Sequence, residues 1–142
     1  MFRVGSTSYG IAIDAVEEIL PLLPVTSTPG APRGVLGFAN IRKRVAPVFD
    51  LHERFGIERP ADSSETRLIL VSIEDTAVAL LVDEVDEVLT VRNEDVQPAA
   101  SLGATAAVDY LRGVVREGDR LLLWVDHTRL APAAVRNLEC AA

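Results

Sequence analysis

The chain has 142 residues and a formal net charge of -7, and its hydrophobic share of 49% includes only 5% aromatic residues. This length suits one domain with an aliphatic core of its own. The acidic balance argues against general nucleic-acid binding, because neutralising phosphates requires a broad basic face. Cys140 is the single cysteine, which excludes a disulfide framework and a cysteine-based zinc site.

The compartment is also suggested by composition. One lone cysteine is typical of a reducing, cytoplasmic environment. No apolar run approaches the ~20 residues of a membrane span, and Met1 leads into a predicted strand without a signal peptide. We therefore expect a soluble intracellular protein that is not inserted into a membrane.

The first segments of the chain predict short strands broken by turns. Strands are expected at 2–4 and 9–13 around a Gly-Ser turn. Residues 14–20 fit either a short helix or a third strand, because their alternating acidic and apolar side chains do not decide between the two. Pro21 and Pro24 end any helix there, and a loop follows.

The most conspicuous stretch is a predicted hairpin with a basic turn. Apolar runs at 35–38 and 45–51 flank three consecutive cations, Arg42, Lys43 and Arg44. The turn is either a solvated hairpin tip, where like charges cost little, or a positive docking point on an acidic surface, and the residues leave both open. Beyond it, an Asp N-cap and a terminal Gly predict a short helix over 50–56.

The second half of the chain is also predicted to form hairpins. Strands are expected at 67–73, 77–82, 110–116 and 120–126. Acidic residues alternate with Val and Leu over 83–91, which predicts a half-buried strand with an acidic outer face. Residues 96–107 look like a loop of small residues, and 127–139 like a C-terminal helix weakened by Pro132.

The spacing of these strands predicts the fold class. Many short strands separated by Gly turns favour an all-β barrel or sandwich. Hairpins occur on both sides of the polar stretch 58–65, so we expect two small interleaved β-subdomains with an approximate division near 57–66.

A search for catalytic chemistry is mostly negative. His52 and His127 are isolated, and the chain has no G-x-S-x-G elbow, P-loop or G-x-G-x-x-G motif. Four carboxylates could bind a divalent cation or act as acids and bases, but their alternation with valines favours a solvated strand face: Asp83, Glu84, Asp86 and Glu87. A small hydrolase or metal-binding protein is thus a minor alternative to an interaction module, whose opposite charges would steer association.

Several short motifs, each occurring once, follow one another at defined spacings along nearly the whole chain. They are Phe2-x-x-Gly5-x-x-x-Tyr9-Gly10-Ile11, Val16-x-Glu18-Ile19, Pro32-x-x-Val35-x-Gly37-x-x-Asn40-Ile41-Arg42, Pro47-x-x-Asp50-Leu51, Val82-Asp83-x-Val85-x-x-Val88, Tyr110-Leu111-x-Gly113 and Gly118-x-Arg120-Leu121. This pattern resembles CheW, the coupling protein of bacterial chemosensory arrays, which is similar to the regulatory domain of the kinase CheA.

The resemblance implies one CheW-like domain over 1–142, made of two SH3-like five-stranded β-barrel subdomains that share a core, with short helices. It implies a cytoplasmic, non-catalytic adaptor without cofactor or metal, associated with receptor arrays. Its partners would be the cytoplasmic tip of a chemoreceptor (a methyl-accepting chemotaxis protein) and the regulatory domain of a CheA-type histidine kinase. The receptor-binding residues it implies are Val16, Glu18, Asn40, Ile41, Arg42 and, at the altered turn, Lys43.

Two departures from the family pattern lead to expectations of their own. Lys43 stands where the family usually has Gly, so we expect another turn type or strain of about 1 kcal/mol. The chain begins close to its first strand, which we expect to leave part of a sheet edge uncovered. The alternative function is therefore a divergent one-sided CheW paralogue that binds receptor but not kinase, or the reverse, in a motility pathway.

Overall fold

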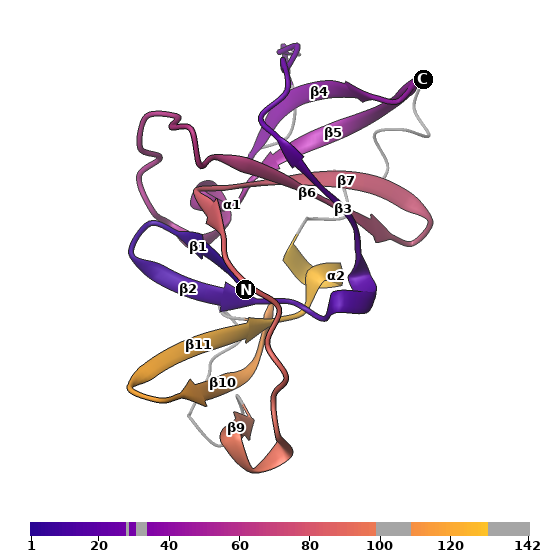
Figure 1. The fold of residues 1–142 in the computed structure, drawn as a ribbon. Helices are drawn as coiled ribbons and strands as arrows, with labels where there is room; N and C mark the ends of the chain where they lie inside the picture. Colours follow the sequence, from indigo (N-terminus) through magenta and orange to yellow (C-terminus); the bar gives the residue numbers. More distant parts are fainter. Residues whose placement is uncertain (28, 31–33, 99–108, 131–142) are drawn as a thin grey trace.

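The computed structural model describes residues 1–27, 29–30, 34–98 and 109–130, and Figure 1 shows their strands arranged in two sheets. The first, here called the terminal sheet, takes its strands from both ends of the chain. In spatial order these are β8 (Glu84–Val85), β1 (Phe2–Val4), β2 (Thr7–Gly10), β11 (Arg120–Val125), β10 (Leu111–Glu117) and β9 (Val96–Pro98). The described part of this sheet therefore has six strands, one more than expected.

The second, here called the central sheet, has the expected five strands. Their spatial order is β3 (Val16–Pro21), β6 (Arg67–Ile73), β7 (Thr76–Val82), β5 (Arg44–Asp50) and β4 (Val35–Ile41). Strand β7 is paired on both sides, by β6 and β5, and its apolar run is buried along its whole length because its alternate side chains enter two different core clusters, one on each face of the sheet. The prediction of an all-β fold with two β-subdomains is confirmed.

The stretch 57–66, proposed as an approximate division, lies within the course of one sheet. It connects β5 and the helix that follows it to β6, and all three elements belong to the central half of the fold. The chain enters the terminal sheet first, passes through the whole central sheet, and then returns. The two subdomains are thus interleaved in sequence.

The ambiguous segment 14–20 is a strand for most of its length. A short 3-10 helix, η1 (Ile13–Ala15), precedes β3, whose residues pair antiparallel with β6. Residues of β3 alternate between half-buried and exposed along the strand. The partner strand decides the conformation here, because the local pattern fits both periods.

The central sheet closes on itself beyond β3. Thr26 and Phe38 exchange two backbone hydrogen bonds of 2.8 and 2.9 Å, which join the chain after β3 to the edge strand β4. The backbone approach is close at Gly37, where a Cβ atom would lie 2.0 Å from the carbonyl oxygen of Thr26. Only glycine fits this position, which explains one residue of the motif noted in the sequence.

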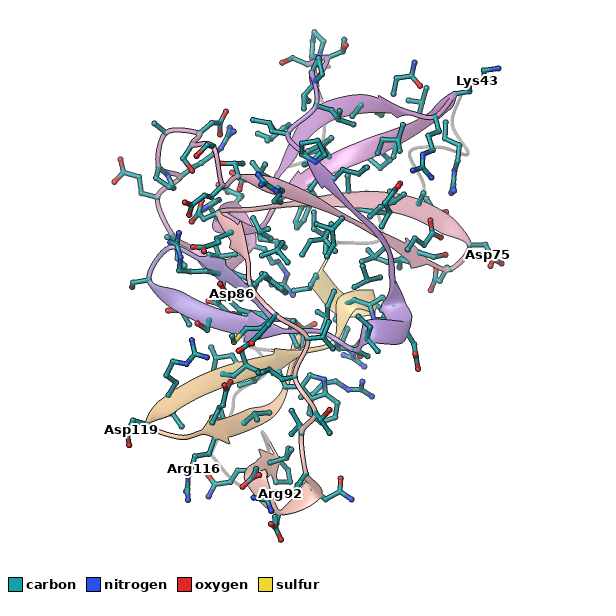
Figure 2. The ribbon with its side chains drawn as sticks, viewed as in Figure 1. Lys43, Asp75, Asp86, Arg92, Arg116 and Asp119 are labelled. Carbon is teal, nitrogen blue, oxygen red and sulfur yellow. The ribbon has the colours of Figure 1, made fainter. Side chains whose placement is uncertain are left out.

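The tight turns of the central sheet use residues other than glycine. Arg42 and Lys43 have φ values of 52° and 69°, and Glu74 and Asp75 have φ values of 53° and 66°. Two consecutive positive φ values are typical of the type I′ turn that joins two-residue hairpins. Lys43 therefore accepts the strained conformation that glycine would adopt freely, and Figure 2 shows it at a hairpin tip.

Three local predictions are wrong or only partly right. The segment 83–91 is a strand only at Glu84–Val85, and the rest is irregular. Strand β1 is not an edge, because β2 and β8 pair with its two sides. The predicted loop 96–107 begins with the edge strand β9, and 99–107 lies outside the described residues.

The predicted short helices are present. Helix α1 (Leu51–Phe55) has Asp50 as its N-cap and Gly56, at φ 70°, as its C-cap. Helix α2 (His127–Leu130) follows β11, whereas the remainder of the predicted C-terminal helix and Cys140 lie outside the described residues. Among the described residues, no helix is long and apolar enough to cross a bilayer. The caps were readable in the sequence because they depend on neighbouring residues only.

Side chains of helix α1 connect the two sheets. Phe55 stacks on Tyr9 of β2 at 4.3 Å between ring centroids and packs in a tilted arrangement against Tyr110 at 5.1 Å, although α1 directly follows a strand of the central sheet. Arg54 lies over the Tyr110 ring and donates hydrogen bonds to the carbonyl oxygens of Arg129 and Leu130 in α2. These contacts hold the terminal sheet and α2 against the central sheet.

Candidate functional site

The basic turn is largely paired within the protein. Arg42 forms an ion pair with Glu18 on β3, and Arg44 Nη1 lies 3.6 Å from Glu17 Oε2 on the same strand. These contacts join the β4–β5 hairpin at one edge of the central sheet to β3 at the other. The structure therefore brings the predicted receptor residues Glu18 and Arg42 together, and their charged groups pair with each other.

The remaining predicted receptor residues are placed differently. Ile41 is buried at 4% exposure, so its side chain belongs to the core of the central sheet. Asn40 is exposed and lies directly opposite Val45, which is 58% exposed. Sequence reasoning missed Val45 as a surface residue, because it begins an apolar run that otherwise points inward.

An apolar groove of about 370 Å³ lies between the two sheets, and we call it the inter-sheet groove. Val16 and Ile19 of β3 contribute from the central sheet, while Leu122 and Trp124 of β11 contribute from the terminal sheet. Of the predicted receptor residues, Val16 lies in this groove. Its volume is within the range of pockets that bind ligands.

Large exposed apolar side chains gather in this groove. Six such residues are exposed in the described part of the chain, and four of them line the groove: Ile13, Ile19, Val88 and Val91. Val88 is the most exposed of them, at 71%. Clustered apolar exposure of this kind marks an interaction site more often than scattered exposure does.

The outer wall of the groove is the irregular segment 86–95. It leaves β8 at one edge of the terminal sheet and reaches β9 at the other edge, through a 3-10 helix, η2 (Asn93–Asp95). The alternation of acidic and apolar residues that suggested a strand instead places valines toward the groove. The alternation of acidic and apolar residues was visible in the sequence, but it predicted a strand where the segment is irregular.

Two carboxylates and one ammonium group carry the charge of the groove lining. Asp86 and Glu87 lie directly before Val88, and the Met1 ammonium nitrogen donates a hydrogen bond of 3.0 Å to the backbone oxygen of Glu87. Burial lowers the pKa of the Met1 ammonium below its ordinary value, although Asp86 and Glu87 oppose this shift. No Lys or Arg is among the described residues that line the groove.

Two of the candidate catalytic groups of the sequence, His52 and Asp83, are occupied by contacts within the protein. His52 is 1% exposed and lies between two carboxylates, so its ring is unavailable to a substrate. Asp83 accepts a hydrogen bond from the backbone of Gly5 and is part of the same buried network. Within the described residues, no group of three or more His, Cys, Asp or Glu side chains could hold a metal ion.

The comparisons with known proteins agree with this architecture. The family model described as CheW-like domain matches residues 1–135. The chain belongs to the CheW-like family. The CheW-like resemblance noted in the sequence is thereby confirmed.

Relatives and a solved structure extend the match over most of the chain. The chemotaxis protein CheW of Rhizobium meliloti is 33% identical over 96% of this chain and 88% of its own length. That of Treponema pallidum is 32% identical over 91% of this chain and 78% of its own length. The crystal structure of the scaffolding protein TtCheW from Thermoanaerobacter tengcongensis superposes with a TM-score of 0.82 at 28% identity, covering 91% of this chain and 88% of that one.

Proposed function

We propose that this protein is a cytoplasmic, non-catalytic adaptor that couples a chemoreceptor tip to a CheA-type histidine kinase. One observation carries the proposal: in a CheW-like chain, four of the six large apolar side chains that are exposed among the described residues converge on the inter-sheet groove. A protein that presents such a surface and buries His52 between two carboxylates has the features of an interaction module.

The receptor tip is expected to dock in the inter-sheet groove. Its helical hairpin would place an apolar ridge against Ile19 and Val88, which are exposed in the free protein. Strand β3 links this groove to the predicted receptor residues, since Val16 and Ile19 face the groove while Glu17 and Glu18 hold the β4–β5 hairpin. The groove and the hairpin thus share one strand as a common support.

The kinase regulatory domain is expected to use apolar surface outside the groove. Leu121 of β11 is 63% exposed and Val45 of β5 is 58% exposed, and neither lines the inter-sheet groove. One residue lies on each sheet, so each subdomain offers an apolar contact to a second partner. Two separate surfaces would allow receptor and kinase to bind at the same time.

A paired binding assay tests the proposal. A soluble receptor-tip fragment and a CheA regulatory domain are titrated separately against the wild-type protein, Ile19→Asp and Leu121→Asp. We expect Ile19→Asp to lose receptor-tip binding and to keep kinase binding, while Leu121→Asp shows the opposite result. Both variants add one charge at an exposed strand position, so each serves as the control for the other.

The outcome that rejects the adaptor role is a wild-type protein that binds neither fragment. Binding to one fragment only would instead support the one-sided paralogue. Neither departure that suggested this alternative removes an element of the fold, because β1 is paired on both sides and the Arg42–Lys43 turn still closes its hairpin.

A further inference from the structure

Asp86 and Glu87 form an acidic rim on the inter-sheet groove. Both side chains are exposed, and they precede Val88, the most exposed apolar residue of the groove. Figure 2 shows Asp86 well away from the hairpin tips that carry Asp75 and Asp119. We call these two residues the acidic rim.

The acidic rim lacks the arginine partners that neighbouring carboxylates have. Glu84, two residues before the rim, lies 3.2 Å from Arg3, and Glu18 on β3 pairs with Arg42. In the described part of the chain, no Lys or Arg side chain forms an ion pair with Asp86 or Glu87.

The nearest compensating charge is the Met1 ammonium. Its pKa is lowered from an ordinary value of 8.0, because burial disfavours the charged form. One partly buried ammonium therefore faces two exposed carboxylates, and the fraction of this amine that is protonated falls as pH rises toward 8.0. The net charge of the acidic rim together with the Met1 ammonium therefore remains negative.

A docked partner would exclude water from the edge of the groove. Desolvating a carboxylate is unfavourable unless an opposite charge or hydrogen-bond donors replace the lost water. Because no Lys or Arg of this chain lines the groove among its described residues, the partner has to supply the cation. Opposite charges at the edge of an interface also set orientation and speed association.

We infer that the partner of the inter-sheet groove is an amphipathic helix that carries a Lys or Arg beside its apolar ridge, positioned on Asp86 and Glu87. A helix suits the groove because the exposed apolar side chains come from η1, β3 and segment 86–95, and helical anchors recur every three or four residues. The long stem of Lys or Arg can lie on apolar surface while its charge reaches the rim. This inference rests on the proposed docking of a receptor tip.

The test compares two charge-matched double variants. Asp86→Asn/Glu87→Gln neutralises the acidic rim, and Asp75→Asn/Asp119→Asn removes the same charge at two hairpin tips. Each is titrated with a soluble receptor-tip fragment at low and at high salt. We expect the rim variant to bind about three- to tenfold more weakly than wild type at low salt, with a flatter dependence on salt.

The outcomes separate this inference from the proposed function. If wild type and the hairpin-tip variant bind the fragment but the rim variant binds with the same affinity and salt dependence, the acidic rim does not recognise a cation and the inference is wrong. Tighter binding by the rim variant would overturn it as well. If wild type itself does not bind, the receptor docking has failed. A urea unfolding curve of each variant shows whether it is folded, independently of either partner.

Discussion

The imidazole of His52 lies between the carboxylates of Asp50 and Asp83. Its Nδ1 atom is 2.6 Å from Asp50 Oδ1, and its Nε2 atom is 2.9 Å from Asp83 Oδ2. Asp83 Oδ2 also accepts a 2.7 Å hydrogen bond from the backbone N–H of Gly5 in the β1–β2 turn. One buried network therefore joins α1, the end of β7 and the first hairpin of the terminal sheet.

Removing the ring should leave buried charge without a partner. We expect His52→Leu to lower the free energy of unfolding by about 3–5 kcal/mol, because both carboxylates would remain in a site with little water. His52→Gln, which can still donate a hydrogen bond, should cost less. Urea denaturation measures both, and equal losses for Leu and Gln would show that a hydrogen bond to the two carboxylates is not what the ring contributes.

The closure of the central sheet depends on Gly37. A Cβ atom there would overlap the carbonyl oxygen of Thr26, so Gly37→Ala should separate the two chain segments and destabilise the protein by about 2–3 kcal/mol. Gly118→Ala is the control, because Gly118 also has a positive φ but no atom lies within 4 Å of the place that a Cβ would occupy. It should cost about 1 kcal/mol. A smaller loss for Gly37→Ala than for Gly118→Ala would contradict this account.

Lys43 is strained in its turn, so replacing it should stabilise the hairpin. Lys43→Gly is expected to raise the free energy of unfolding by about 1 kcal/mol, since glycine adopts φ 69° without steric conflict. Lys43→Ala removes the same charge and keeps the Cβ atom, so it should give no such gain. Thermal denaturation of the two variants separates backbone strain from charge, and an equal gain in both would favour charge.

The Glu18–Arg42 ion pair should affect binding through the position of the β4–β5 hairpin. We expect Glu18→Arg to weaken receptor-tip binding, because it places two like charges together across the sheet edges. The charge-swapped double variant Glu18→Arg/Arg42→Glu should recover most of the affinity. Isothermal titration of the single and double variants measures this coupling. A double variant as weak as the single one would mean that the receptor contacts these side chains directly.

Asp126 directly precedes helix α2, and its carboxylate accepts hydrogen bonds of 3.0 and 2.6 Å from the N–H and hydroxyl of Thr128. Burial alone would raise the pKa of Asp126, but these two bonds, with Arg112 and His127, lower it below 3.8. The ionised cap therefore stabilises the fold above that value, and this contribution is lost as pH falls through the lowered pKa.

Asp126→Ala should thus cost about 1 kcal/mol at neutral pH, the usual loss for a helix N-cap. The difference from wild type should shrink in acid below the lowered pKa, where the wild-type carboxyl is protonated as well. Denaturant unfolding at the two pH values measures it. A difference that is the same at both would show that the charge of the cap contributes nothing.

Much of the fold could be predicted from local pattern. The strands around Glu74–Asp75 and around Gly118 were expected at nearly their observed bounds, because long apolar runs separated by turn residues have one consistent reading. The caps of α1 at Asp50 and Gly56 were also expected, because capping depends only on residues next to the helix in the chain.

The candidate site was predicted less well, because it depends on residues far apart in the chain. The sequence indicated Val16, Glu18 and Arg42, but not that the last two pair with each other. Ile41 looked like a contact residue and is core. The groove residues Ile13 and Val88 could not be grouped, since nothing in their local patterns shows that η1 and segment 86–95 face the same space.

Local pattern and motif spacing were enough to assign the class of this protein: an acidic all-β chain, built from apolar hairpins with recognisable caps, in the CheW-like family. Long-range packing established that residues 16–21 form a strand, that Arg42 and Arg44 of the basic turn pair with Glu18 and Glu17, and that an apolar groove with an acidic rim opens between the sheets. Hairpins and caps arise between neighbours in the chain, whereas strand pairing across sheets and surface complementarity are set by long-range packing.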